Sequence, residues 1–424
     1  MPYERDLVET TIARVGGRGG CTRSRTPASV ARRRPYWPPV GSSATRPAAA
    51  TAGLACARSC RSHRFTPRPS RLDRVRRISL WPRIADLELA VERVEHDVLE
   101  PGRGFGEAHA NRLVRLTGAG AEGLGEDITL VMGGDAPGLD LAGEWTLAGF
   151  CDHLHGLDQW PGGPPESHWE MAARFRNWAF ESAALDLALQ QAGQPLHAVL
   201  GRTPRPVTYV NSLGLGDPPD AGAILRRLER YPGLRFKLDA AATWTPEIIE
   251  ELVGTGAVHT VDFKGQYGLE VEDVDALARV YAWLLEAFPE ALLEDPHDLP
   301  EITPLVREHA ARVAYDAPIV TVADLDATAF AANVFNVKPS RVGRLETLFE
   351  LYAECERRGA LLYGGGMGEL GVARGQVQLL ASMFSPDAPN DIAPPGFNAL
   401  EPAAGLPLSP LDPAPAPTGF RRAA

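Results

Sequence analysis

From about residue 205 onward, short β-rich apolar segments alternate with amphipathic helical stretches, and this alternation constrains the fold more than any other feature of the chain. The units repeat at roughly 20–30 residues, which is the length of a strand, a helix and their loops. Such repeats form either a closed parallel barrel or an open doubly wound sheet. No GxGxxG follows a first strand, so the pattern favours the barrel. The apolar segments are residues 207–213, 234–238, 260–263, 291–293, 313–315, 334–337 and 361–363.

Helical periodicity is clearest in two of the connecting stretches. Residues 274–288 and 345–355 place apolar side chains at the i, i+3, i+4, i+7 spacing of one helix face. Thr245 followed by Pro246 predicts the start of another helix, with a capping residue and a proline at the first helical position. These stretches are therefore expected to be the helices that connect parallel strands.

The part of the chain before the barrel has a different pattern and is expected to form a separate α+β unit. Its predicted elements are strands over 87–94 and 111–117, a turn over 118–125 and a long helix over about 168–192. The expected organisation of the chain is an extension over 1–77, the α+β unit over 78–205, the barrel over 206–390 and a Pro-rich segment over 391–424.

The first 77 residues differ sharply in composition from the rest. They hold 17 Arg, no Lys and 4 acidic residues, a net charge of +13, so the remainder carries −24 of the total of −11. With almost no apolar periodicity they are expected to be disordered. The segment is interpreted either as an organelle transit peptide or as a non-native upstream extension, and the lack of a clear amphipathic helix favours the second.

Composition excludes several classes of protein. No apolar run reaches the ~18 residues that a membrane span needs, and no signal-peptide core is present. The five cysteines form no CxxC pair, which argues against a zinc ribbon or a disulfide framework and suits a reducing cytoplasm. The net charge of −11 argues against a general nucleic-acid binder. We therefore expect a cytoplasmic protein with a small-molecule partner and neither nucleic acid nor membrane.

Lysine is the rarest cation in the chain. There are 40 Arg but only three lysines, Lys237, Lys264 and Lys338. Arginine keeps its proton near neutral pH, whereas a lysine close to other positive charge can lose it. The three lysines are therefore candidate general bases, although three leftover surface lysines would give the same count.

Five charged residues follow successive apolar segments, in the order Lys237, Asp262, Glu294, Asp316 and Lys338. The gaps of 25, 32, 22 and 22 residues each correspond to about one βα unit. Because barrel enzymes place their chemistry at the carboxyl ends of the strands, these side chains are expected to converge on one site.

This set of residues predicts a metal site. Three carboxylates alone would repel one another, and a divalent cation removes that penalty; oxygen ligands with open water positions suit Mg²⁺. A lysine at each end of the arc would face a bound substrate from opposite sides, with its pKa lowered by the metal and by the other lysine. The chemistry that needs this arrangement is abstraction of a proton α to a carboxylate, because Mg²⁺ stabilises the oxygens of the resulting enediolate.

Further motifs lie on both sides of these residues. They are Arg115-Leu116 through Glu122-Gly123-Leu124-Gly125-Glu126, Ala179 through Asp186, Gly193-Gln194-Pro195-Leu196 with Leu200-Gly201, and Gly366-Met367-Gly368-Glu369-Leu370-Gly371. With these motifs the chain resembles, over about 85–400, the enolase superfamily. The resemblance is to the subgroup of muconate-lactonizing enzymes, o-succinylbenzoate synthases and N-acylamino-acid racemases or dipeptide epimerases.

The resemblance implies an α/β fold, a (β/α)7β TIM-like barrel with an N-terminal α+β capping domain toward which the C-terminal segment returns. It implies a Mg²⁺-dependent isomerase or lyase that acts on a small-molecule carboxylate, as a racemase or epimerase, a cycloisomerase or a dehydratase, and a homo-oligomer is compatible with it. The implied metal ligands are Asp262, Glu294 and Asp316, and the implied bases are Lys237 and Lys338. Glu369 and Gly366 are implied to lie near the substrate carboxylate.

The chain departs from the usual pattern in four places: Ala317 follows Asp316 where Glu is usual, Arg344 follows Gly343 where a second Gly is usual, and the other two are at Lys237-Leu238-Asp239 and Lys264. Lys237-Leu238-Asp239 stands where many members have Lys-x-Lys, and Lys264 stands where Asn is common. By the two-residue strand period, Lys264 shares a face with Asp262. Lys264 either binds a second substrate carboxylate or pairs with the metal ligands and weakens metal binding. Asp239 is either a salt-bridge partner of Lys237 or a substrate contact.

Two functions from different classes remain open from the sequence. The first is the Mg²⁺-dependent enzyme. The alternative is a catalytically inactive barrel that serves as a binding or scaffold protein, with Lys264 in place of the metal. The loop 102–107 is interpreted either as an ordinary surface loop or as a lid over the substrate.

Overall fold

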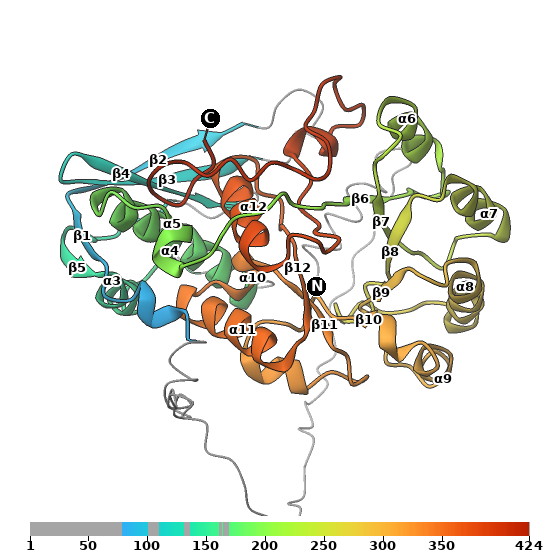
Figure 1. Ribbon diagram of the computed structural model, residues 1–424. Coiled ribbons are helices and arrows are strands. Elements are labelled where there is room, and N and C mark those ends of the chain that lie inside the picture. Colours follow the sequence, from blue (N-terminus) through green and yellow to red (C-terminus); the bar gives the residue numbers. More distant parts are fainter. Residues whose placement is uncertain (1–78, 101–109, 131–135, 161–162, 164–168, 424) are drawn as a thin grey trace, which may run out of the picture.

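The computed structural model describes residues 79–423 except 101–109, 131–135, 161–162 and 164–168. The extension over 1–77 and the loop 102–107 therefore lie outside the described residues. Figure 1 shows the N-terminal unit on one side of the molecule and the parallel strands with helices α6 to α9 on the other.

The N-terminal unit is built on an antiparallel sheet of order β2-β3-β4, with a separate antiparallel pair β1-β5. Its strands are β1 (Glu88–Val91), β2 (Arg93–Leu99), β3 (Asn111–Gly118), β4 (Ala121–Asp127) and β5 (Gly143–Thr146). Its helices are α3 (Leu147–His155), α4 (Trp169–Gln191) and α5 (Leu196–Leu200). The long predicted helix is confirmed as α4, which packs against β4.

The predicted turn over 118–125 is wrong in extent. The chain reverses at Ala119 and Gly120, which both have positive φ, and β4 begins directly afterwards. Gly123 and Gly125 lie within the strand because α4 passes so close that a Cβ at either position would collide with backbone carbonyls of the helix. These glycines serve close packing of a strand on a helix and do not mark a turn.

The second part alternates strands and helices, as the sequence predicts. Its strands are β6 (Asn211–Gly214), β7 (Phe236–Asp239), β8 (Val258–Asp262), β9 (Leu292–Glu294), β10 (Val313–Ala314), β11 (Val334–Val337) and β12 (Leu361–Gly364). Its helices are α6 (Gly222–Arg230), α7 (Pro246–Thr255), α8 (Val274–Ala287), α9 (Thr303–Arg307), α10 (Pro339–Val342), α11 (Leu345–Arg358) and α12 (Val372–Phe384). Helix α7 begins at Pro246 as predicted, but the Thr245 side chain makes no capping hydrogen bond.

All strand pairs in this second part are parallel. Strands β6 to β10 form one sheet in chain order and β11 pairs with β12. Single parallel bridges join Tyr315 to Phe335, Gly365 to Asp391 and Tyr209 to Asn390, which connects the two sheets and the last segment to the first strand. The carboxyl ends of these strands consequently meet on one side.

The two parts share one continuous apolar core. Buried side chains such as Leu116 of β3, Trp178 of α4, Val261 of β8 and Leu348 of α11 belong to the same cluster. The C-terminal segment also reaches the N-terminal unit, because Arg421 contacts Glu122 of β4 and Asp186 of α4. Within the described residues, no helix combines the length and apolarity required to cross a bilayer.

Candidate active site

Three carboxylates converge at the carboxyl ends of neighbouring strands. Asp262 ends β8, Glu294 ends β9 and Asp316 lies two residues beyond β10. Each offers an oxygen within 4.8 Å of the others, and all three are fully buried. Asp262 and Glu294 are register partners across the β8–β9 pair, so the strand pairing itself brings the first two carboxylates together.

Cationic side chains contact each of these carboxylates. Lys237 Nζ lies 2.9 Å from Asp262 Oδ2 and also contacts Glu294 Oε1. Lys338 Nζ lies 2.8 Å from Asp316 Oδ2. The structure therefore brings together the five residues that the sequence placed at successive strand ends.

Several residues of this cluster were not found from the sequence. Arg341 Nη1 donates to Asp316 Oδ1 at 2.5 Å, Tyr363 Oη donates to Glu294 Oε2 at 2.7 Å, and Tyr267 Oη donates to Asp316 Oδ2 at 3.0 Å. Asp391 Oδ2 lies 3.5 Å from Lys237 Nζ. Only Tyr363, which lies in a predicted strand, carried a signal in the sequence; Arg341 and Asp391 follow strands by distances that no local pattern specifies.

Asp295 holds the segment that carries Asp316. Its two carboxylate oxygens accept hydrogen bonds from the backbone N–H groups of Asp316 and Ala317, each at 2.8 Å. Asp295 has φ 46° and Lys264 has φ 55°, left-handed conformations that are costly for residues other than glycine. Each of these two residues is therefore held against a local strain of about 1–3 kcal/mol by contacts within the cluster.

The cluster carries more negative than positive charge. Its six carboxylates are Asp239, Asp262, Glu294, Asp295, Asp316 and Asp391, and its four cations are Lys237, Lys264, Lys338 and Arg341. Six carboxylates against four cations leave a formal surplus of two negative charges. One divalent cation would neutralise that surplus, and three convergent carboxylates are the donor set that Mg²⁺ prefers, so the residues fit such an ion.

Burial and the neighbouring charges together shift the pKa values of the cluster. Burial raises the pKa of Glu294 to about 8 although Lys237 opposes the increase, and burial together with the neighbouring carboxylates raises the pKa of Asp295 to about 7. Burial would also raise the pKa of Asp262, but Lys237 and Lys264 hold it below the ordinary value. Burial would lower the pKa of Lys237, but Asp262 and Glu294 hold it well above the ordinary value. The lowered lysine pKa expected from a bound metal ion and the second amine stays a prediction for Lys237.

Lys264 and Asp239 form a pair at the more open part of the cluster. Lys264 Nζ lies 2.6 Å from Asp262 Oδ2 and 3.4 Å from Asp239 Oδ1. The side chains of Lys264 and Asp239 are 24% and 29% exposed, whereas that of Lys237 is 1% exposed. The predicted pairing of Asp239 with Lys237 is not what the structure shows, because Lys264 is the ion-pair partner.

Glu369 and Gly366 lie on the loop after β12. Glu369 is fully buried, where it accepts hydrogen bonds from Ser340 Oγ and Met367 N at 2.9 Å each and lies 3.6 Å from Arg374. A Cβ at Gly366 would crowd Glu369 and Arg374. In the described contacts Glu369 therefore organises its own loop.

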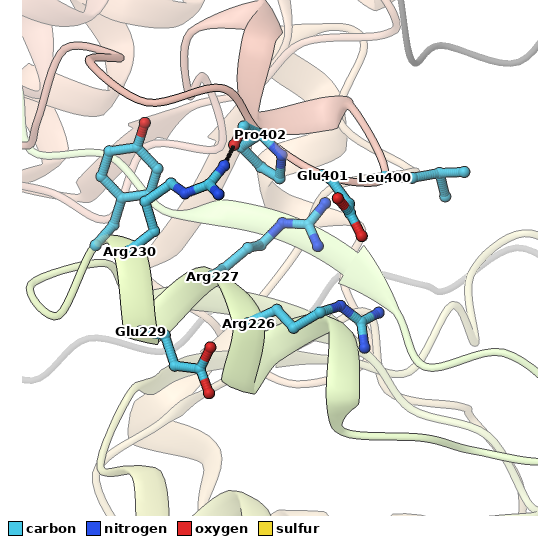
Figure 2. Close-up of a pocket in the computed structure, with 8 residues that line it drawn as sticks. Arg226, Arg227, Glu229, Arg230, Leu400, Glu401 and Pro402 are labelled. Atoms are coloured by element: carbon cyan, nitrogen blue, oxygen red, sulfur yellow. Dashed lines mark hydrogen bonds between the residues drawn. The ribbon is translucent and has the colours of Figure 1, made fainter.

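A separate cavity of about 270 Å³ lies between α6 and the C-terminal segment. Figure 2 shows Arg226, Arg227 and Arg230 around it. Arg227 donates to the carbonyls of Phe397 and Ala399, and Arg230 donates to the carbonyl of Pro402. Two of its arginines thus fasten the C-terminal segment to α6, and none of its lining residues belongs to the carboxylate cluster.

Comparison with family models places two matches on the chain. Residues 82–199 match "Domain of unknown function (DUF8230) N-terminal domain", and residues 203–399 match "Domain of unknown function (DUF8230) C-terminal domain". The boundary between the two matches lies at the end of α5, between the N-terminal unit and the first parallel strand, β6.

Curated proteins with similar sequences are named as racemases, epimerases and synthases. An N-succinylamino acid racemase from Thermus thermophilus is 31% identical over 302 residues, covering 66% of this chain and 77% of that protein. A hydrophobic dipeptide epimerase from Roseobacter litoralis is 26% identical, covering 68% and 84%. An o-succinylbenzoate synthase from Geobacillus stearothermophilus is 26% identical, covering 51% and 58%.

Two solved structures share the fold. A dipeptide epimerase from Methylococcus capsulatus, complexed with Mg ion, has a TM-score of 0.52 and 21% identity, with 72% of this chain and 90% of that one covered. A muconate cycloisomerase from Pseudomonas fluorescens has a TM-score of 0.50 and 20% identity, with 76% and 92% covered. These likenesses show an α/β fold of the TIM-barrel type.

Proposed function

Because this chain belongs to the enolase superfamily, in the group that includes N-succinylamino acid racemases, o-succinylbenzoate synthases and dipeptide epimerases, we propose that it abstracts the α-proton of a carboxylate substrate with the help of Mg²⁺. It is an isomerase or lyase of that superfamily. The observation that carries the proposal is the buried Asp262, Glu294 and Asp316 cluster with a lysine beside it.

The proposed magnesium ligands are Asp262, Glu294 and Asp316. When bound, the ion would neutralise the surplus negative charge of the site and favour the charged enediolate form of a substrate carboxylate. Arg341 and Lys338 hold opposite oxygens of Asp316, and Asp295 fixes the backbone of Asp316, so this carboxylate is oriented before any ligand arrives.

Lys338 is the proposed general base. It follows β11 directly, is 5% exposed, and among the described residues its ammonium contacts one carboxylate, Asp316. The backbone of Gly365 passes so close that any Cβ there would collide with Lys338 Cε, which fixes the direction of the lysine side chain. An amine held in one direction at a strand end is suited to remove a proton from a substrate bound at the carboxyl ends of the strands.

The proposed architecture is a (β/α)7β barrel over 206–390 under an N-terminal cap over 78–205, with 391–424 returning to the cap. The bridges of Tyr315 with Phe335, Gly365 with Asp391 and Tyr209 with Asn390 support a closed ring of strands. The contacts of Arg421 with Glu122 and Asp186 support the returning segment. A cap over the mouth would exclude water from the reacting carboxylate.

The test is exchange of a substrate α-hydrogen with solvent deuterium in the presence of Mg²⁺. Because the relatives are named for N-succinylamino acids, o-succinylbenzoate and hydrophobic dipeptides, the panel contains N-acyl amino acids, dipeptides and cyclic carboxylates. We expect Mg²⁺-dependent exchange with at least one class and its loss in Lys338→Ala. Purified protein that neither binds Mg²⁺ nor exchanges any of these compounds would favour the inactive binding barrel instead.

A further inference from the structure

Lys237 and Lys338, which the sequence predicts on opposite faces of the substrate, occupy different positions relative to the carboxyl ends of the strands. Asp239, Asp262 and Glu294 are consecutive register partners on β7, β8 and β9, so they form one row across the sheet. Lys237 precedes Asp239 by two residues on the same strand, which places its backbone about 6.6 Å farther from the open end. Lys237 therefore approaches the carboxylates from inside the barrel, whereas substrates enter from the carboxyl ends of the strands.

The ammonium of Lys237 is also enclosed by carboxylates. An ammonium has three N–H donors, and three carboxylates surround Lys237 Nζ, those of Glu294, Asp262 at 2.9 Å and Asp391 at 3.5 Å. Its side chain is 1% exposed. Lys338, by contrast, contacts the single carboxylate of Asp316 among the described residues, so two of its donor directions remain.

Asp239 is the last residue of β7 and therefore the member of this row that lies on that strand at the open end of the site. Its Oδ1 atom is buried and accepts no hydrogen bond among the described residues, although Lys264 Nζ lies 3.4 Å away. Lys264 in turn spans Asp262 and Asp239 and lies over the Tyr267 ring, 5.4 Å from its centroid. This side of the site is thus formed by the Asp239–Lys264 ion pair, in which Asp239 Oδ1 can still accept a hydrogen bond.

We infer that the site exchanges protons with its substrate on the Lys338 side alone, and that the opposite wall, the Asp239–Lys264 pair, binds the substrate through a donor group that Asp239 accepts. This inference rests on the proposed function. Lys237 is a fixed counter-charge beneath the carboxylates. In such a site the enediolate formed by removal of the α-proton either takes a proton back on the same face or uses its electron pair to expel a leaving group from the adjacent carbon of the substrate. It does not invert the α-carbon. The chain differs in this respect from the racemase that it resembles.

The matching substrate is a carboxylate that carries a hydrogen-bond donor, such as an amide N–H, an ammonium or a hydroxyl, near its α-carbon. Asp239→Asn keeps the shape but removes the charge and half of the acceptor capacity. We expect Asp239→Asn to raise the KM for exchange by at least ~10-fold with a smaller effect on kcat. A loss confined to kcat would contradict a binding role.

The decisive measurement is the stereochemistry of exchange in the unaltered protein. Each stereoisomer of an exchanging substrate is incubated separately in D2O with Mg²⁺ and analysed by NMR and chiral chromatography. We expect one stereoisomer to gain α-deuterium with retention and the other to remain unlabelled. Interconversion of the two stereoisomers would overturn the inference while leaving the proposed function intact. Absence of exchange together with absence of Mg²⁺ binding would overturn both.

Two matched variants assign the lysines. Arginine keeps the positive charge but does not give up its proton, so Lys338→Arg is expected to lose at least ~10²-fold in exchange rate, whereas Lys237→Arg stays within ~10-fold of the unaltered protein. Lys237→Met replaces Lys237→Arg if the larger side chain prevents folding. If folded, Mg²⁺-binding variants of Lys237 and Lys338 lost the same fraction of the exchange rate, proton exchange on the Lys338 side alone would be contradicted. If neither Lys237 variant folds, the stereochemical result decides.

Discussion

Glu126 of strand β4 accepts a hydrogen bond from the backbone N–H of Gly371, so a carboxylate of the N-terminal unit caps the start of helix α12 in the other unit. Glu126 also accepts from the N–H groups of Leu370 and Ala373 and from Asn111 Nδ2. These bonds fasten the N-terminal unit to the loop that follows β12.

Removing this carboxylate is expected to loosen the contact between the two units. Glu126→Ala leaves three backbone N–H groups without their acceptor, and of their hydrogen bonds that of Ala373 is buried. An orphaned group costs about 1–3 kcal/mol where water cannot reach it. We expect the free energy of unfolding to fall by at least ~2 kcal/mol, measured by urea denaturation. Glu122→Ala, whose side chain is 42% exposed, is the control and should cost less than 1 kcal/mol. Equal effects of the two substitutions would contradict the capping role.

Magnesium is expected to stabilise the protein. A ligand that binds only the folded state at 100 times its Kd adds about 2.7 kcal/mol to the free energy of unfolding. Saturating Mg²⁺ should therefore raise Tm in a thermal unfolding scan, and EDTA should reverse the increase. Asp262→Asn should remove the effect, whereas Glu356→Gln, in the exposed ion pair with Arg202, should preserve it. A Tm independent of Mg²⁺ in the unaltered protein would contradict the metal site.

Two adjacent glycines provide a matched pair for testing the position of Lys338. A Cβ at Gly365 would meet Lys338 Cε and Asn336 Oδ1 at distances that real structures do not show, whereas a Cβ at Gly364 would lie 3.4 Å from Asn390 Oδ1. Gly365→Ala should displace the amine by about 1 Å and lower the deuterium exchange rate by up to ~10²-fold. Gly364→Ala should keep most of the exchange. The proposed direction of Lys338 would be excluded if the two variants exchanged equally well.

The pair of Tyr281 and His297 predicts a pH dependence. Tyr281 Oη accepts a hydrogen bond from the backbone N–H of His297 and forms a second hydrogen bond, at 3.0 Å, with Nδ1 of the same residue. Burial lowers the pKa of His297 below 6.5, so the unfolded chain binds the proton more tightly than the folded one. Stability is therefore lost as pH falls below about 6.5.

We expect the drop in Tm between pH 7.5 and pH 5.5 to be smaller in His297→Gln than in the unaltered protein. His309→Gln is the matched control, because His309 lies outside this pair, and it should leave the drop nearly unchanged. Tm at both pH values is read by differential scanning calorimetry. A pH dependence identical in all three proteins would show that protonation of His297 is not coupled to folding.

Periodicity located the strands and helices well because buried faces repeat along the chain. The predicted segments at 334–337 and 361–363 correspond to β11 and β12, and the helix expected over 274–288 is α8. The prediction of a turn over 118–125 was wrong because Gly123 and Gly125 are required by the close approach of the α4 backbone, which is more than fifty residues away in the sequence. Local patterns carry no information about such contacts.

The sequence by itself determined which strand ends carry charge, and hence the meeting of Asp262, Glu294 and Asp316, because parallel strands in chain order bring their carboxyl ends to one side. Only the tertiary structure decided which groups surround each lysine. Lys237 and Lys264 are both lysines near strand ends, yet one is enclosed by three carboxylates and the other pairs with Asp239 at the open end. That difference arises from strand register and from residues such as Asp391, far along the chain, because electrostatic partners are set by distance in space.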